Sequence, residues 1–217
     1  MRDNKVVATA AALVIFGSAL ITVFSFSGGF GPSLDPAPHQ AAGRALARQT
    51  LSLLQPGGRI VVIARDTVAF ENPAGEILIA AFRKELSKAG AKIDAIQSIG
   101  INADKPLLVP ADDFIRLIHG GANGSVIVSL MGPPMLTEAQ ISQLGQVKPA
   151  IVAFCPGALR NRVDLRSLFA QGLLQAAIVS KPHAAIVRGA AKGEQEAFDR
   201  QFIEVTASSL TALSAPP

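Results

Sequence analysis

Two residues capable of nucleophilic chemistry follow predicted strands in this 217-residue sequence. Cys155 ends the run AIVAFC, and His183 follows the run QAAIVS. A thiolate activated by an imidazole attacks carbonyl carbons, so the pair is a candidate for a hydrolase. However, Cys155 does not lie in a G-x-C-x-G sequence, which is the form of a nucleophile elbow. Free cysteine is also among the most buried residue types. We therefore interpret Cys155 as a buried structural thiol and predict that the chain is not an enzyme.

Polar side chains that could hold a ligand also follow several predicted strands. The candidates are Arg65, Asp66, Asn102, Arg160 and Arg162. A guanidinium group can bind a carboxylate, a phosphate or a lipid headgroup. The two later arginines could equally belong to a solvated loop, and Arg65 could simply pair with Asp66. These residues are the predicted ligand contacts if the chain binds a solute.

Other kinds of site are excluded or unsupported. The sequence contains neither G-x-G-x-x-G after the first strand nor G-x-x-x-x-G-K-[ST]. It therefore has neither of these two motifs for binding the phosphates of a nucleotide cofactor. Its single cysteine excludes an intrachain disulfide and a multi-thiolate metal site, and its three histidines lack ligand spacing. The net charge of +4 is small and scattered, which argues against nucleic acid. We predict no cofactor and no metal.

Two loops are unusually apolar. One contains Leu107 and Leu108, and the other is the segment Met131-Gly132-Pro133-Pro134-Met135. Because loops normally face water, an apolar loop suggests a pocket wall or a protein contact surface. The alternative is that each loop folds back on the core.

The elements that must position these residues alternate regularly along the chain. Apolar runs typical of buried parallel strands occupy 59–64, 125–130, 150–155 and 175–180, and an alternating strand pattern occupies 92–99. Helical patterns lie between them: Asn72-Pro73 resembles a helix start, and Thr137 to Gln140 has the form of a capping box. Residues 184–188 suggest a sixth strand. Residues 194–213 suggest a closing helix, with a strand at 202–207 as the alternative.

This alternation predicts an α/β fold, a Rossmann-like or flavodoxin-like three-layer domain with a mainly parallel sheet of about five strands. The segments after the strands then meet at one edge of the sheet, including Cys155 to Gly157 and Lys181 to His183. In this pattern the domain resembles one lobe of a periplasmic binding protein, a family whose two lobes close on a ligand. The resemblance implies that a partner would have to complete the cleft between lobes.

The N-terminal segment predicts a membrane anchor. Residues 6–26 contain no charge and are long enough for one transmembrane helix, and Arg2 and Lys5 before them place residues 1–5 in the cytoplasm. Residues 27–43 then form a Gly/Pro-rich linker, and 44–217 form a periplasmic domain. A cleaved signal peptide is the competing interpretation. Ala8, Ala12 and Ala19 lie roughly on one face of the helix, where they would allow close helix packing.

Together these features lead to a functional hypothesis. An anchor, a linker and apolar loops without an assembled catalytic set favour a non-catalytic accessory subunit, which docks on a larger inner-membrane complex. Its partners would be other integral membrane proteins and membrane lipid. The alternative is a tethered periplasmic domain that binds or senses a small-molecule solute.

Overall fold

The computed structural model of this protein describes residues 34–66, 71–100, 108–145, 148–157, 159, 163–181 and 191–212. The chain divides into two units, Met1–Asp35 and Pro36–Pro217. Of the first unit only residues 34 and 35 are described, so the predicted span 6–26 lies outside the described residues. No helix in the described part of the chain has the length and apolar character needed to cross a membrane.

The second unit alternates helices and strands. Its elements are α2 (Pro36–Leu53), β1 (Ile60–Arg65), α3 (Pro73–Lys88), β2 (Ala95–Ile99), α4 (Ala111–Gly120), β3 (Val126–Ser129), α5 (Glu138–Ser142), β4 (Ala150–Cys155), α6 (Leu165–Ala170), β5 (Ala176–Ser180), α7 (Glu194–Gln201), β6 (Phe202–Thr206) and the 3₁₀ helix η2 (Ala207–Ala212). Both predicted helix starts are confirmed. Asn72 caps α3 with Pro73 following it, and Thr137 and Gln140 form a capping box on α5.

Within the described residues these strands form one six-stranded sheet in the order β2-β1-β3-β4-β5-β6. The first five strands are parallel, with Ile63 of β1 beside Ser129 of β3 and Cys155 of β4 beside Val179 of β5. Strand β6 runs antiparallel to β5. The predicted α/β fold with a mainly parallel sheet is therefore confirmed, with six strands in place of about five.

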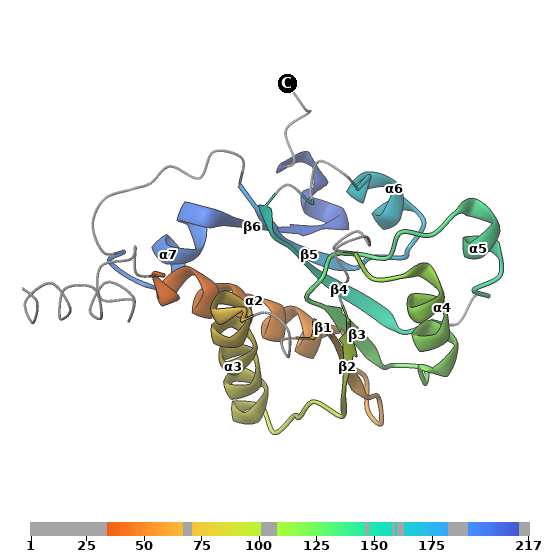
Figure 1. Ribbon diagram of the computed structural model, residues 1–217, viewed down its shortest axis with the longest axis horizontal. Coiled ribbons are helices and arrows are strands. Elements are labelled where there is room, and N and C mark those ends of the chain that lie inside the picture. Colours follow the sequence, from red (N-terminus) through yellow and green to blue (C-terminus); the bar gives the residue numbers. More distant parts are fainter. Residues whose placement is uncertain are drawn as a thin grey trace, which may run out of the picture. The chain divides into compact units, whose positions relative to one another are not determined.

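Helices cover both faces of the sheet and create two cores (Figure 1). On one face, α2, α3 and α7 pack over the even-numbered residues of the central strands, such as Val62 and Val128. On the other face, α4 and α6 cover the odd-numbered residues, such as Ile127 and Ile151. The central strands are apolar on both faces because both are buried, as continuous apolar runs predict.

Two boundaries differ from the predictions. Helix α2 begins at Pro36, so the later part of the predicted linker 27–43 is helical. The predicted closing helix 194–213 is wrong beyond Gln201, and the alternative of a strand at 202–207 is confirmed, because Phe202–Thr206 forms β6. The backbone of this segment bonds to the edge of β5, with Ser180 opposite Phe202, and sheet pairing outweighs the local helical pattern. The other predicted sixth strand, 184–188, lies outside the described residues.

Candidate functional site

A pocket of about 610 Å³ lies at the carboxyl edge of the sheet, on the face covered by α2 and α3. We call it the strand-edge pocket. Its lining residues are His39, Ala64, Arg65, Asn72, Ala74, Gly75, Glu76, Leu78, Ile79, Ile96, Ser98, Leu130, Phe154, Pro156, Gly157, Ser180, Lys181, Gln201 and Phe202. In open parallel sheets this edge is where ligands usually bind, and the volume is in the range of small-molecule sites.

The floor of the pocket is apolar because it is made by the last core positions of the parallel strands. Ala64 of β1 and Leu130 after β3 are half-buried, and Phe154 of β4 is nearly buried. Phe154 packs against Phe202, with ring centroids 5.5 Å apart. These side chains continue the core of this face to the edge of the sheet, where no further core layer covers them.

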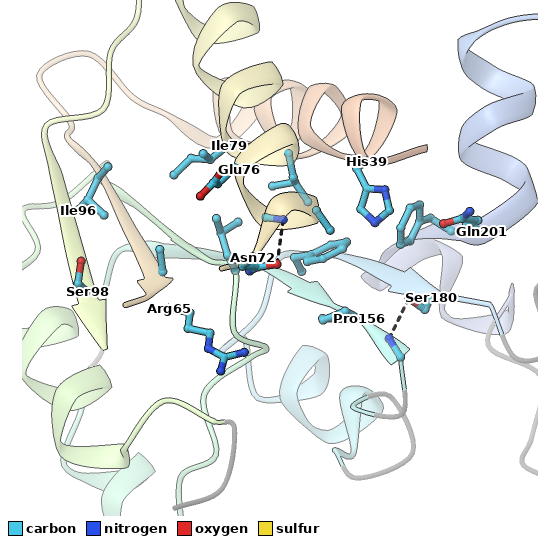
Figure 2. Close-up of a pocket in the computed structure, with 18 of the residues that line it drawn as sticks. His39, Arg65, Asn72, Glu76, Ile79, Ile96, Ser98, Pro156, Ser180 and Gln201 are labelled. Carbon is cyan, nitrogen blue, oxygen red and sulfur yellow. Dashed lines mark hydrogen bonds between the residues drawn. The ribbon is translucent and has the colours of Figure 1, made fainter. Parts of the chain in front are cut away.

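The first turns of α3 form the opposite wall (Figure 2). Asn72 Oδ1 accepts a hydrogen bond from the Gly75 N–H at 3.1 Å, which satisfies one free donor at the start of the helix. Leu78 and Ile79 then present aliphatic surface on this helix. The cap fixes where α3 begins and therefore fixes the position of this wall.

Polar groups line both ends of the pocket: His39, Ser180 and Gln201 lie toward one end in Figure 2, and Arg65, Glu76 and Ser98 lie toward the other. The Gly157 N–H donates to Ser180 Oγ at 3.0 Å, and the Lys181 N–H donates to the Gln201 carbonyl at 2.7 Å. Lys181 Nζ also donates to the Asp199 carbonyl. These bonds connect the ends of β4, β5 and α7, so this end of the pocket is held by one backbone hydrogen bond and two bonds between a side chain and the backbone.

The pocket is open because α3 packs against α2 and leaves β2 largely uncovered. Gly43 of α2 lies so close to α3 that an added Cβ would approach the Leu78 carbonyl oxygen to 2.3 Å. On β2, four of the five residues are exposed, and Ile96 is 40% exposed although it faces the pocket. Because α3 packs against α2, it does not also cover the edge strand β2. The strand-edge pocket is the space between α3 and β2.

The structure brings together only part of the predicted ligand set. Arg65 lines the strand-edge pocket at the end of β1 (Figure 2). Asp66 is half-buried, and its N–H donates to the Ile99 carbonyl at 2.9 Å. Asn102, Arg160 and Arg162 lie outside the described residues, as does His183. Three residues that the predicted topology placed on this edge, Pro156, Gly157 and Lys181, do line the pocket.

Sequence reasoning missed His39, because residue 39 falls within the predicted linker 27–43. His39 lies in the second turn of α2, is half-buried and meets the ring of Phe202 edge-on at 6.0 Å. The pair Asp35-Pro36 carried the missed signal, since a capping acid followed by proline is typical of a helix start. No feature of the sequence indicated that residues of α3 would line a pocket. They line it only because α3 packs against α2.

Among the described residues of the predicted interaction surface, three of five are buried. Met131, Pro133 and Pro134 are buried, Leu108 is half-buried and Met135 is 43% exposed. The loop after β3 therefore folds back on the core through most of its length. Four further residues of that predicted surface lie outside the described residues, namely Ala8, Ala12, Ala19 and Leu107.

Cys155 is buried in the core on the α4 and α6 face, at 1% exposure. Burial without a compensating charge raises the pKa of its thiol to about 12, because the apolar surroundings disfavour the thiolate. At neutral pH the group is a protonated, inaccessible thiol. Such a thiol fits a structural role and does not fit a nucleophile. Among the described residues, no cluster of three acidic, histidine or cysteine side chains is arranged to hold a metal.

Comparison with known proteins relates this fold to solute-binding proteins. An ABC-transporter solute-binding protein from Burkholderia graminis, solved with D-arabinose, has 17% identity and a TM-score of 0.51 over 82% of this chain and 62% of that one. The arabinose-binding protein AraP from Geobacillus stearothermophilus has 13% identity and a TM-score of 0.52 over 82% and 63%. No protein-family model matches the chain, and no curated protein matches it. The likeness defines the fold, and the chain spans less than two thirds of those structures.

These findings correct the functional hypothesis. The prediction of an accessory subunit docking on a larger membrane complex is wrong, because the fold is shared with solute-binding proteins and agrees with the alternative prediction of a solute-binding domain. The physical basis of the error is the loop after β3. Its apolar side chains suggested a docking surface, yet Met131, Pro133 and Pro134 contribute to the interior.

Proposed function

We propose that this chain is a solute-binding domain that holds a small organic molecule in the strand-edge pocket. The observation that carries the proposal is the pocket itself, a hollow of about 610 Å³ at the carboxyl edge of a mainly parallel sheet. Ligands of such sheets bind at this edge, where apolar walls and a few polar groups converge. The fold shared with D-arabinose- and arabinose-binding proteins supports the same conclusion.

The pocket lies within one α/β domain, and the described residues that line it all come from that domain. In the proposed function, binding does not depend on a second lobe closing over the ligand. Contacts from α2, α3 and five strands surround the molecule on several sides. This explains how a chain shorter than the structures it matches could bind a solute by itself.

The test is a solute screen with a variant that fills the pocket. We expect at least one member of a panel of sugars, amino acids and organic acids to raise the melting temperature of the full chain, since a ligand that binds only the folded state stabilises it. Ala74→Phe places a ring in the pocket and should weaken that binding about tenfold or more. Ala80→Phe, on the exposed side of the same helix, is the matched control and should bind normally.

Two outcomes would contradict the proposal. One is a panel in which no solute changes the melting temperature. The other is a solute that binds equally well to the wild-type chain and to Ala74→Phe, because its site then lies elsewhere.

A further inference from the structure

A groove between α3 and β2 extends the strand-edge pocket along the edge of the sheet, and it narrows the class of solute. We infer that the solute is a short extended peptide with free termini, whose main chain adds a strand to β2 and whose first residue occupies the pocket. This inference rests on the proposed function. Strand addition supplies affinity through main-chain hydrogen bonds and specificity through alternate side chains.

Strand β2 is an edge strand with no protection against pairing. Within the described residues it pairs with β1 alone, on one side. Four of its five residues are exposed, and Ala95–Ile99 contains neither a charged residue nor a proline. Natural edge strands usually carry charge or proline, or lie under a helix, because their free N–H and C=O groups can pair with another strand. The outer edge of β2 is therefore suited to an added strand.

The groove is formed by two hollows that adjoin at Ile96. The strand-edge pocket of about 610 Å³ and a second hollow of about 340 Å³ both have Ile96 in their lining. Glu76 and Ile79 line the first, and Arg83 and Ser87 line the second. Their spacing of three or four residues places these four on one face of α3, and Figure 2 shows Glu76 and Ile79 on the α3 side with Ile96 on the β2 side. We call this space the α3–β2 groove.

The two ends of the α3–β2 groove differ in charge. Glu76 lies at the end near the carboxyl terminus of β2. At the other end Arg83 and Lys92 outnumber Asp94, whose Oδ2 accepts the Ile60 N–H at 2.8 Å. Among the described residues, none forms an ion pair with the side chain of Glu76, Arg83 or Lys92. An antiparallel peptide places its ammonium group at Glu76 and its carboxylate at the two cations, and an internal segment of a protein has neither terminal charge.

Arg65 does not cancel the charge of Glu76 in this arrangement. Arg65 is paired in register with Ile99, which belongs to the core on the α4 face, so its side chain leaves the sheet on that face. Figure 2 shows the guanidinium pointing away from α3. Arg65 and His39 also have interactions of their own within the protein, so neither is counted as a charge that awaits a ligand.

The remainder of the strand-edge pocket fits the side chain of the first peptide residue. Its floor at Leu130 and Phe154 is apolar, and Ser180, Lys181 and Gln201 line the far end. A side chain with an apolar body and a polar tip buries the body on this floor and brings the tip to hydrogen-bonding groups. Tyrosine has this form.

The length of the groove sets the length of the peptide. Arg83 follows Glu76 by seven positions, which is about 10 Å along the helix axis. An extended chain advances about 3.4 Å per residue, so a peptide of about three or four residues brings its termini to both charges. Its first and third side chains then share the face of Ile96 and point into the groove.

The test is calorimetric titration of the full chain in lipid nanodiscs with the tetrapeptide Tyr-Thr-Val-Thr, and empty nanodiscs give the background. In the solute screen tyrosine is the expected ligand, because it is the first residue alone. The tetrapeptide should bind about tenfold or more tightly than tyrosine, since it adds main-chain hydrogen bonds. Tyr-Val-Thr-Thr should bind more weakly than Tyr-Thr-Val-Thr, because its valine faces away from the groove.

Backbone methylation tests the strand pairing directly. Successive N–H groups of an extended chain point to opposite edges, so only one of the second and third peptide nitrogens faces β2. Methylation of that nitrogen should abolish the gain over tyrosine, and methylation of the other should preserve it. Equal effects of the two methylations would overturn the added strand.

The termini are tested with two substitutions on α3. Arg83→Met should weaken binding of the free tetrapeptide about two- to fivefold and leave binding of the carboxyl-amidated peptide unchanged. Glu76→Gln should weaken the free peptide and leave the amino-acetylated peptide unchanged. Lys84→Met, an exposed residue of α3 that lines neither hollow, is the matched control and should bind every form like the wild-type chain. Equal losses for free and blocked peptides would overturn the assignment of the termini.

The results separate the peptide from the proposed function. A screened solute that Ala74→Phe weakens, with no tighter binding of the tetrapeptide than of tyrosine, would overturn the inference and leave the proposed function intact. Tetrapeptide binding that is equal in Ala74→Phe and the wild-type chain would overturn both, because the first residue would not occupy the pocket. A disulfide-linked dimer of Gln97→Cys without peptide binding would show that β2 pairs with a second copy, and it would overturn the inference.

Discussion

Phe154 and Cys155 are neighbours on β4, yet their side chains belong to different cores. Successive residues of a strand point to opposite faces, so Phe154 reaches the strand-edge pocket while Cys155 is enclosed beneath α4 and α6. A shift of one residue in the register of β4 would exchange the two environments. The unreactive thiol and the apolar floor of the pocket therefore have the same geometric cause.

The raised pKa of Cys155 has a consequence for stability at high pH. The folded protein keeps the proton up to about pH 12, whereas the unfolded chain releases it near 9. Stability from this group is therefore complete below pH 9 and is lost as the pH rises toward 12. We expect Cys155→Ala to show a smaller fall in the free energy of unfolding between these pH values than the wild-type chain, measured by urea denaturation.

Thiol labelling provides the accompanying check. A disulfide reagent should react slowly with Cys155 in the native protein at pH 8 and quickly in urea. Fast labelling of the native protein would contradict the buried, protonated thiol and would restore Cys155 as a candidate nucleophile.

At the scale of elements, the close contact of α2 with α3 determines the pocket. Helix α2 is rich in alanine where it is buried, and Gly43 allows the two backbones to approach. Charged contacts on the other side attach α2 to α7, with Arg44 Nε 2.7 Å from Glu194 Oε1. Helix α2 thus holds α3 on one side and α7 on the other, and each contributes to a different end of the hollow.

This packing predicts the effect of a single methyl group. Gly43→Ala places Cβ against the Leu78 carbonyl, so the helices must separate. We expect the free energy of unfolding to fall by about 1–3 kcal/mol, measured by urea denaturation. Gly120→Ala is the matched control, because an added Cβ at this last residue of α4 meets nothing within 4 Å. It should be neutral or stabilising by up to about 1 kcal/mol.

Equal effects of the two substitutions would show that helix propensity decides the outcome and that the contact between α2 and α3 is not tight. A solute identified in the screen extends the test. Its affinity should fall for Gly43→Ala and stay constant for Gly120→Ala, since only the first substitution moves a wall of the pocket.

At the scale of the whole molecule, the α/β domain begins at the edge of the sheet that carries the pocket. Helix α2 leads into the amino end of β1 and therefore begins near the carboxyl edge, where His39 lines the hollow. The residues before α2 include the apolar run 6–26, for which the membrane anchor stays a prediction.

Fractionation tests the anchor. We expect the full chain to remain with the membranes after alkaline carbonate extraction, because one apolar helix is held by the hydrocarbon core. Val14→Arg, which places a charge in the middle of the run, should release part of the chain. A mature protein whose mass shows that it begins near Ser27 would instead support the cleaved signal peptide.

The order of the elements could be predicted from local pattern. Continuous apolar runs identified β1, β3, β4 and β5 because strands buried on both faces must be apolar throughout. The caps at Asn72 and Thr137 identified two helix starts because those side chains satisfy nearby backbone donors. Parallel topology then predicts that Arg65, Pro156, Gly157 and Lys181 lie at one edge of the sheet, and all four line the pocket there.

Only the tertiary structure decided which apolar segments are covered. The loop at 131–134 and the strand at 95–99 both carry apolar side chains, yet the first is buried and the second is largely exposed. The hydropathy of a segment reflects the free-energy cost of exposing its side chains to water. It does not show whether another element of the fold covers that segment. Similarly, Phe202 formed a strand because the edge of β5 was available for pairing. Burial depends on contacts between residues far apart in the chain, such as Gly43 with Leu78, and these contacts created the pocket.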